Sequence, residues 1–103
     1  MSDFESARRN MVDCQLRPTK VTDIRILDAM GTLPREMFVD KSRQGIAYVD
    51  EDIEIAPGRH MMEPVVLARL VQALDIGATD SVLVIGAGTG YDAAVIGTLA
   101  GPV

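Results

Sequence analysis

The residues best suited to chemistry in this chain of 103 residues form one glycine-rich turn. Alternate glycines permit positive φ angles and let a ligand approach the backbone without meeting a Cβ atom. The turn follows an unbroken apolar run at residues 82–85 and precedes an alanine-rich segment. A strand, a glycine turn and a helix in this order are typical of loops that hold a nucleotide-like cofactor. The turn consists of Gly86, Ala87, Gly88, Thr89, Gly90 and Tyr91.

The spacing of the glycines distinguishes the binding sites of two kinds of cofactor. Dinucleotide sites use G-x-G-x-x-G, and here the third glycine, Gly90, comes one residue early, so that Tyr91 stands where that pattern has glycine. G-x-G-x-G after an apolar strand is instead the spacing of methyltransferases, whose cofactor carries a carboxylate and a ribose but no phosphate. Two alternatives remain open: a turn that binds nothing, and a dinucleotide-dependent oxidoreductase, which Tyr91 disfavours.

The segments around the turn must position it. Residues 82–85 predict a strand covered on both faces, as in parallel α/β sheets, and residues 92–99 predict the helix that follows the turn. Upstream, residues 6–15 predict a surface helix and residues 42–48 a short one, while residues 52–55 alternate in the period of a half-buried strand. This order predicts N-terminal helices followed by the beginning of a doubly wound α/β sheet.

Two clearer helices are expected between these elements. Thr22 is expected to cap the first, which Gly31 ends; Pro64 suits the first turn of the second, which ends near Gly77. The residues expected to be buried at helical spacing are Ile24, Ile26, Leu27 and Met30 in the first helix, and Val66 or Leu67, Leu70, Val71 and Leu74 in the second.

Composition excludes several function classes. The formal net charge is -5, so the chain lacks the basic surface that binding to a phosphate backbone requires. No apolar stretch is long enough to span a bilayer, and the acidic, polar N-terminus does not resemble a secretory signal. Cys14 is the single cysteine, so no intrachain disulfide can form, which fits the cytoplasm. Cys14 is expected to be structural, and His60 to be solvated.

Five stretches of the chain, in order, resemble the N-terminal part of the protein-L-isoaspartate O-methyltransferase family. The resemblance runs from about Arg9 to Leu99. Its most specific part is Pro34-Arg35-Glu36 followed by Phe38-Val39 at this distance before the glycine turn. The stretches are residues 21–23, 26–30, 33–39, 47–50 and 82–94.

The resemblance implies a protein-repair enzyme with a Rossmann-like fold that uses S-adenosylmethionine to methylate the α-carboxylate of isoaspartyl residues. It implies no metal. The expected organisation is a single incomplete domain, in which residues 1–78 form a helical region with a short strand and residues 79–103 begin the methyltransferase sheet. The acidic residue that holds the ribose should lie about 20 residues after the turn, beyond Val103. We therefore expect weak cofactor binding, no activity from this chain alone, and self-association through the strand at residues 82–85.

Three residues depart from the family pattern. Met62 stands where the family carries an active-site serine, and a thioether cannot donate a hydrogen bond, so the catalytic residue is unknown. Glu63 beside it would repel an anionic acceptor, unless it is only an acidic residue at a helix N-terminus. Val84 replaces the acidic residue that orders the glycine turn around the cofactor. These changes leave two hypotheses open: a divergent enzyme, and a non-catalytic interaction module on a methyltransferase scaffold.

Overall fold

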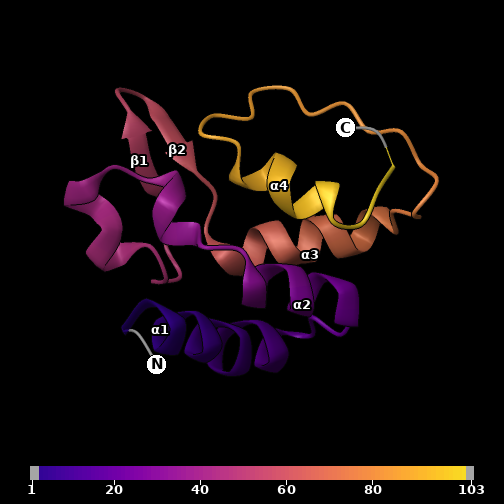
Figure 1. The fold of residues 1–103 in the computed structure, drawn as a ribbon, viewed down its shortest axis with the longest axis horizontal. Helices are drawn as coiled ribbons and strands as arrows, with labels where there is room; N and C mark the ends of the chain where they lie inside the picture. Colours follow the sequence, from indigo (N-terminus) through magenta and orange to yellow (C-terminus); the bar gives the residue numbers. More distant parts are fainter. Residues whose placement is uncertain (1–2, 102–103) are drawn as a thin grey trace.

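The computed structural model describes residues 3–101 of the chain. The α-helices lie one above another in chain order, from the N-terminal helix at the bottom of the view to the C-terminal helix near the top, and a β-hairpin lies at the upper left (Figure 1). The helices contact each other through α1 with α2, and through α2 with both α3 and α4. The elements in chain order are α1 (Asp3–Asn10), a π-helical segment (Met11–Leu16), a 3₁₀ turn (Arg17–Thr19), α2 (Ile24–Thr32), two further 3₁₀ turns (Arg35–Phe38 and Lys41–Ile46), β1 (Ile53–Ala56), β2 (Arg59–Met61), α3 (Pro64–Leu74) and α4 (Tyr91–Gly97).

Helix α2 forms where the apolar pattern predicts it, with different ends. Asp23, not Thr22, is the cap: its carboxylate accepts a hydrogen bond of 3.0 Å from the N–H of Arg25. The helix continues through Gly31 and ends before Pro34, which disfavours a helical conformation in the residue before it. The predicted core residues Ile26, Leu27 and Met30 are buried. Ile24 is 61% exposed because it is the first helical residue and lies off the buried stripe, so its predicted burial was wrong.

Helix α3 begins at Pro64, as predicted. Two side chains from an earlier part of the sequence cap its N-terminus. The Asp52 carboxylate accepts a hydrogen bond of 2.9 Å from the Glu63 N–H, and the Asp50 carboxylate accepts one of 3.2 Å from the Val65 N–H. These two bonds satisfy backbone donors that have no partner within the helix.

The buried face of α3 differs from the prediction. The residues that face the core are Pro64, Leu67, Ala68 and Val71. Leu70 and Leu74 are exposed by 52% and 65% and share an outward line with Val66, so their predicted burial was wrong. The helix carries two apolar lines at helical spacing, and only one of them can face the core.

A hairpin connects the N-terminal helices to α3. The strand predicted at residues 52–55 is confirmed as β1, and the sequence reading missed its partner β2. The strands are antiparallel, with Ile53 opposite Met61 and Glu54 opposite His60. The register shifts between Glu54 and Ala56, which leaves Ile55 as the extra residue of a bulge.

The strand expected at residues 82–85 does not form, and the only sheet among the described residues is the two-stranded hairpin. Leu83 and Ile85 are exposed by 84% and 87%, whereas Val82 and Val84 are half-buried against the core. A strand is defined by hydrogen bonds to a neighbour, and no described segment lies beside this one to supply them. The fold is thus a small mixture of helices and strands, compatible with part of a methyltransferase fold.

The side chain of Gln72 on α3 joins this helix to the bend that precedes α2. The Gln72 amide oxygen accepts hydrogen bonds from the N–H groups of Thr22 and Asp23 at 2.8 and 2.9 Å, and its NH₂ group donates to the Lys20 carbonyl at 3.0 Å. Lys20 has a φ of 70°, in the left-handed region. We call these three bonds the Gln72 clasp. The clasp satisfies the polar backbone of the bend that leads into α2.

Candidate active site at the glycine turn

Of the six residues predicted to bind a cofactor, residues 86–90 lie directly before α4, and Tyr91 is the first residue of that helix. Gly86, Gly88 and Gly90 have φ values of 71°, 58° and 94°, a region that other residues rarely adopt. The Gly90 N–H donates to the Ala87 carbonyl at 2.9 Å, which closes the turn. A Cβ atom at Gly86 or Gly90 would meet no atom within 4 Å, so the glycines leave open space beside the backbone.

The hairpin packs against this turn. A Cβ atom at Gly88 would lie 2.7 Å from Cδ1 of Ile55, the bulged residue of β1. The Thr89 hydroxyl lies 3.9 Å from the Met61 sulfur on β2, a weak hydrogen bond. The hairpin and the glycine turn are therefore in direct contact, although 28 residues separate Met61 from Thr89.

The side chain of Tyr91 points into the core rather than toward the open side of the turn. Tyr91 is 1% exposed, and its ring makes an edge-to-face contact with Phe38, with centroids 5.3 Å apart. The Arg35 guanidinium lies 4.8 Å from the centre of the same ring. Burial raises the pKa of Tyr91 to about 12. A ligand on the open side would thus meet the main chain of Tyr91, while the ring anchors the turn.

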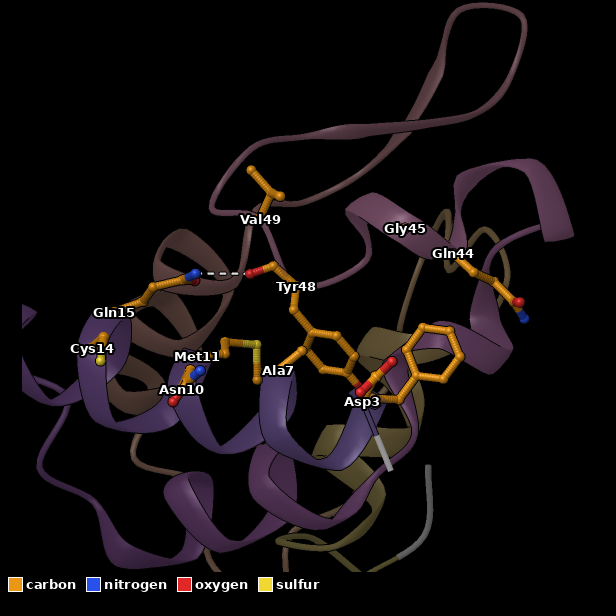
Figure 2. A pocket seen from close by; sticks show the side chains of 11 residues that line it. Asp3, Ala7, Asn10, Met11, Cys14, Gln15, Gln44, Gly45, Tyr48 and Val49 are labelled. Atoms are coloured by element: carbon orange, nitrogen blue, oxygen red, sulfur yellow. Dashed lines mark hydrogen bonds between the residues drawn. The ribbon is translucent and has the colours of Figure 1, made fainter. Parts of the chain in front are cut away.

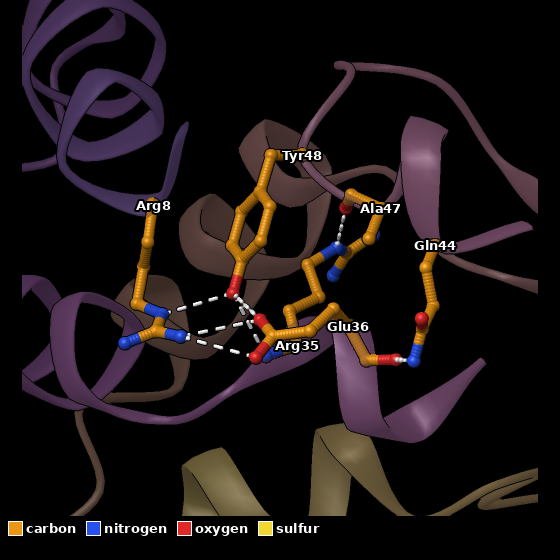
Figure 3. Close-up of polar contacts among 6 residues, drawn as sticks. All are labelled: Arg8, Arg35, Glu36, Gln44, Ala47 and Tyr48. Carbon is orange, nitrogen blue, oxygen red and sulfur yellow. Dashed lines mark hydrogen bonds and ion pairs between the residues drawn. The ribbon is translucent and has the colours of Figure 1, made fainter. Parts of the chain in front are cut away.

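A buried polar network joins Arg8, Glu36 and Tyr48 (Figure 3). The Arg8 guanidinium donates to the Tyr48 hydroxyl at 2.9 Å and to both Glu36 carboxylate oxygens at 3.1 and 3.3 Å. Tyr48 donates a short hydrogen bond to Glu36 and accepts one of 3.0 Å from the Arg35 N–H. This network attaches α1 to the 3₁₀ turn Arg35–Phe38 and to Tyr48, which follows the 3₁₀ turn Lys41–Ile46. The sequence reading missed it, although two charged residues within an otherwise apolar stretch at residues 33–39 are a usable signal.

The network shifts the ionisation of its members. Burial alone would raise the pKa of Glu36, but the hydrogen bonds from Tyr48 and Arg8 outweigh it and hold that pKa below its ordinary value. Burial, together with the bond to Glu36, raises the pKa of Tyr48. At neutral pH the network therefore holds an ionised Glu36, a neutral Tyr48 and a charged Arg8.

The three residues that depart from the family pattern have different surroundings. Met62 is half-buried and packs against the core. Glu63 is the residue just before α3, and burial and the nearby Asp50 raise its pKa. Val84 is half-buried against the core and offers no polar group to the turn.

Two other residues singled out in the sequence lie apart from the turn. His60 is exposed on β2, with its imidazole 3.9 Å from the Glu54 carboxylate. Cys14 is an exposed free thiol on the π-helical segment and lines a cavity of about 470 Å³. This cavity lies between the N-terminal helical segments and residues 44–49 and includes Gln15 and Tyr48 (Figure 2). None of its lining residues belongs to the glycine turn.

Residues 3–101 contain neither a candidate metal site nor a candidate membrane-spanning helix. No group of three or more His, Cys, Asp or Glu side chains there could hold a metal ion. No helix in that range is long and apolar enough to cross a membrane.

Comparison with known proteins identifies a family for this chain. The family model described as protein-L-isoaspartate(D-aspartate) O-methyltransferase matches residues 7–103. A protein-L-isoaspartate O-methyltransferase of Koribacter versatilis is 41% identical over 103 residues, which is 100% of this chain and 46% of that protein. A protein-L-isoaspartate O-methyltransferase 2 of Anaeromyxobacter sp. is 43% identical over 99 residues, 96% of this chain and 41% of that protein. The chain thus spans less than half the length of these curated relatives.

Proposed function

Because this chain belongs to the protein-L-isoaspartate(D-aspartate) O-methyltransferase family, we propose that its glycine turn binds S-adenosylmethionine and that the protein methylates isoaspartyl carboxylates. The observation that carries this proposal is the turn itself, with three left-handed glycines at alternate positions directly before a helix. The reaction is a repair step, since the methyl ester activates the isoaspartyl carboxylate for ring closure to a succinimide.

The residues of the turn fit such a cofactor. The open space beside Gly86 and Gly90 lets a ligand lie against the main chain, and any larger residue there would fill that space. When bound, S-adenosylmethionine supplies an activated methyl group on its sulfonium. The protein's part is then to align donor and acceptor and to exclude water. Val84 contributes no carboxylate to this binding.

The residues around Met62, where the acceptor is expected, support the proposed reaction less than the glycine turn does. Met62 supplies no hydroxyl, and its side chain packs against the core. The carboxylates of Asp50, Asp52 and Glu63 gather at the start of α3, where they would repel an anionic acceptor. These residues favour the second candidate function, a non-catalytic interaction module on the same scaffold.

Restoring the family serine distinguishes the two candidates. In the full-length protein, Met62→Ser is expected to raise methyl transfer to an isoaspartyl peptide about fivefold, the size of one neutral hydrogen bond. The measurement is transfer of labelled methyl from S-adenosylmethionine, with Met37→Ser as the control because Met37 is 70% exposed. No transfer by either the parent protein or the Met62→Ser variant would favour the interaction module.

We also propose that residues 82–85, which form no strand in the described structure, pair with a neighbouring strand in the full-length protein as the first strand of a Rossmann-like sheet. Helix α4 is then the first helix of that sheet, and residues 1–78 and 79–103 have the two expected roles. The support is the alternation along the segment, with Val82 and Val84 turned to the core and Leu83 and Ile85 outward. Two-residue periodicity is typical of a strand.

The same exposure leads us to propose self-association of the 103-residue chain. Leu83 and Ile85 present two large apolar side chains to solvent beside backbone that is free to pair. In sedimentation velocity, the parent chain is expected to shift to faster species as its concentration rises, and Leu83→Lys/Ile85→Lys to abolish the shift. Ile24→Lys/Met37→Lys adds the same charge at other exposed apolar sites and should leave the shift in place. A parent chain that stays monomeric at millimolar concentration would contradict the proposal.

A further inference from the structure

The side chain of Arg35 spans three segments that are far apart in the sequence. It is fully buried, with 0% of its surface exposed. Its Nε donates to the Ala47 carbonyl at 2.6 Å and its Nη2 to the Met62 carbonyl at 3.0 Å. The guanidinium carbon lies 4.8 Å from the centre of the Tyr91 ring. One planar group thus touches Met62, predicted to stand at the family serine position, and Tyr91, the last residue of the glycine turn.

Burying the charged group of Arg35 costs more free energy than filling the same space with an apolar side chain. None of the side-chain hydrogen bonds of Arg35 goes to a carboxylate, so backbone carbonyls and an aromatic face hold its charge. Buried ion groups are often replaced by apolar side chains with no loss of stability. A guanidinium differs from such a filler in that its donors have fixed directions, which set the relative placement of the groups they bind.

Three buried polar groups lie at this contact of Arg35 with the start of α4. Nη1 of Arg35, the Tyr91 hydroxyl and one Asp92 carboxylate oxygen are all buried and have no hydrogen-bond partner among the described residues. Burial raises the pKa of Asp92, and the charge of Arg35 opposes that shift. Arg35 is thus electrostatically coupled to the first turn of α4 as well as bonded to the Met62 main chain.

Two sets of contacts therefore join the same two segments. The hairpin touches the turn through Ile55 with Gly88 and through Met61 with Thr89. Arg35 links the Met62 carbonyl to the Tyr91 ring. Together these contacts fix how far the chain at Met62 lies from the glycine turn.

We propose that Arg35 is a positioning residue for methyl transfer, which holds the main chain at Met62 in one geometry relative to the glycine turn. This rests on the proposed function, in which the acceptor lies near Met62 and the donor at the turn. Arg35 touches neither reactant. A small misplacement of donor and acceptor slows a transfer step strongly, whereas each ligand alone can still bind. Loss of the guanidinium should therefore lower kcat more than it changes KM or cofactor affinity.

The first test uses the full-length protein with Arg35→Lys, which keeps the charge and loses the fork of donors. We expect kcat for an isoaspartyl peptide to fall about tenfold, while KM and the Kd for S-adenosylmethionine change less than twofold. Arg25→Lys is the matched control, because Arg25 also donates to a backbone carbonyl, that of Ile76 at 2.7 Å, away from the site. An unchanged kcat in a folded Arg35→Lys protein would overturn the proposal.

The second test does not depend on activity. Hydrogen exchange of the Glu63 and Gly90 amides, which are bonded to the Asp52 carboxylate and the Ala87 carbonyl, should quicken about tenfold in Arg35→Lys, while the amides of α2 keep their protection. Tyr91→Phe keeps the ring on which Arg35 stacks and should exchange like the parent. If Arg35→Lys does not fold, Tyr91→Leu removes the other side of the same contact and should loosen the same two segments. Unchanged exchange there overturns the positioning role, whereas faster exchange in a protein that methylates no peptide refutes only the proposed function.

Discussion

Glu36→Gln is expected to lower the free energy of unfolding by about 3 kcal/mol, the largest effect on stability that we predict. Glu36 is 7% exposed and binds both Arg8 and Tyr48. An amide of the same shape would leave the Arg8 charge largely buried with no anion beside it. Urea unfolding followed by circular dichroism measures the change.

Glu54→Gln is the control for this substitution. Glu54 is an exposed carboxylate whose contacts with Arg43 and His60 measure 4.0 and 3.9 Å. Exposed pairs at such distances contribute little, so we expect a change within about 0.5 kcal/mol. Equal effects of the two variants would contradict the role assigned to the buried network.

The carboxylate of Glu36 also makes the stability of the protein depend on pH. The pKa of Glu36 lies below its ordinary value of 4.5 in the folded protein, so the unfolded chain binds the proton more readily. Its contribution to stability is complete above about pH 4.5 and is lost as the pH falls through the folded pKa. Stability measured from pH 6 to pH 3 should therefore fall less steeply in Glu36→Gln than in the parent protein.

Gly88→Ala is expected to raise the Kd for S-adenosylmethionine about 30-fold in the full-length protein. Alanine at a φ of 58° costs about 1–2 kcal/mol, and its Cβ would press on Ile55 Cδ1 at 2.7 Å. The turn would relax away from this conformation, and binding would have to restore it; each 1.4 kcal/mol of that work is a factor of about ten in Kd. Isothermal titration calorimetry measures the affinity.

Two further variants separate the causes. Gly97→Ala should leave the affinity unchanged, because Gly97 ends α4 outside the left-handed region and has no neighbour within 4 Å. Adding Ile55→Val to Gly88→Ala removes the crowding methyl group and should recover only part of the loss. Full recovery would show that crowding, and not backbone conformation, governs the turn.

Features encoded by neighbouring residues could be predicted from the sequence. Pro64 marks the start of α3, and the alternation around Ile53 predicts β1, because these signals act over a few residues. The glycine turn is equally local, since its conformation depends on residues that tolerate positive φ.

Features that depend on a distant partner could not be predicted. The apolar run at residues 82–85 suits a strand, yet a strand exists only where another segment pairs with it. Leu70 and Leu67 are equally apolar, and only the packing of α3 decides which of them faces the core. In the candidate site, the network of Arg8, Glu36 and Tyr48 joins residues up to 40 positions apart, and no spacing rule connects them.

The Gln72 clasp also constrains the order of events during folding. Its bonds join Gln72 to Lys20, Thr22 and Asp23, which precede it by 49 to 52 positions in the chain. The Arg25 guanidinium reaches the Ile76 carbonyl across a similar interval. Contacts that close such long loops form late in folding, because much of the chain must lose conformational freedom before these contacts can stabilise it. During synthesis, the bend before α2 can reach its final form only after α3 has left the ribosome.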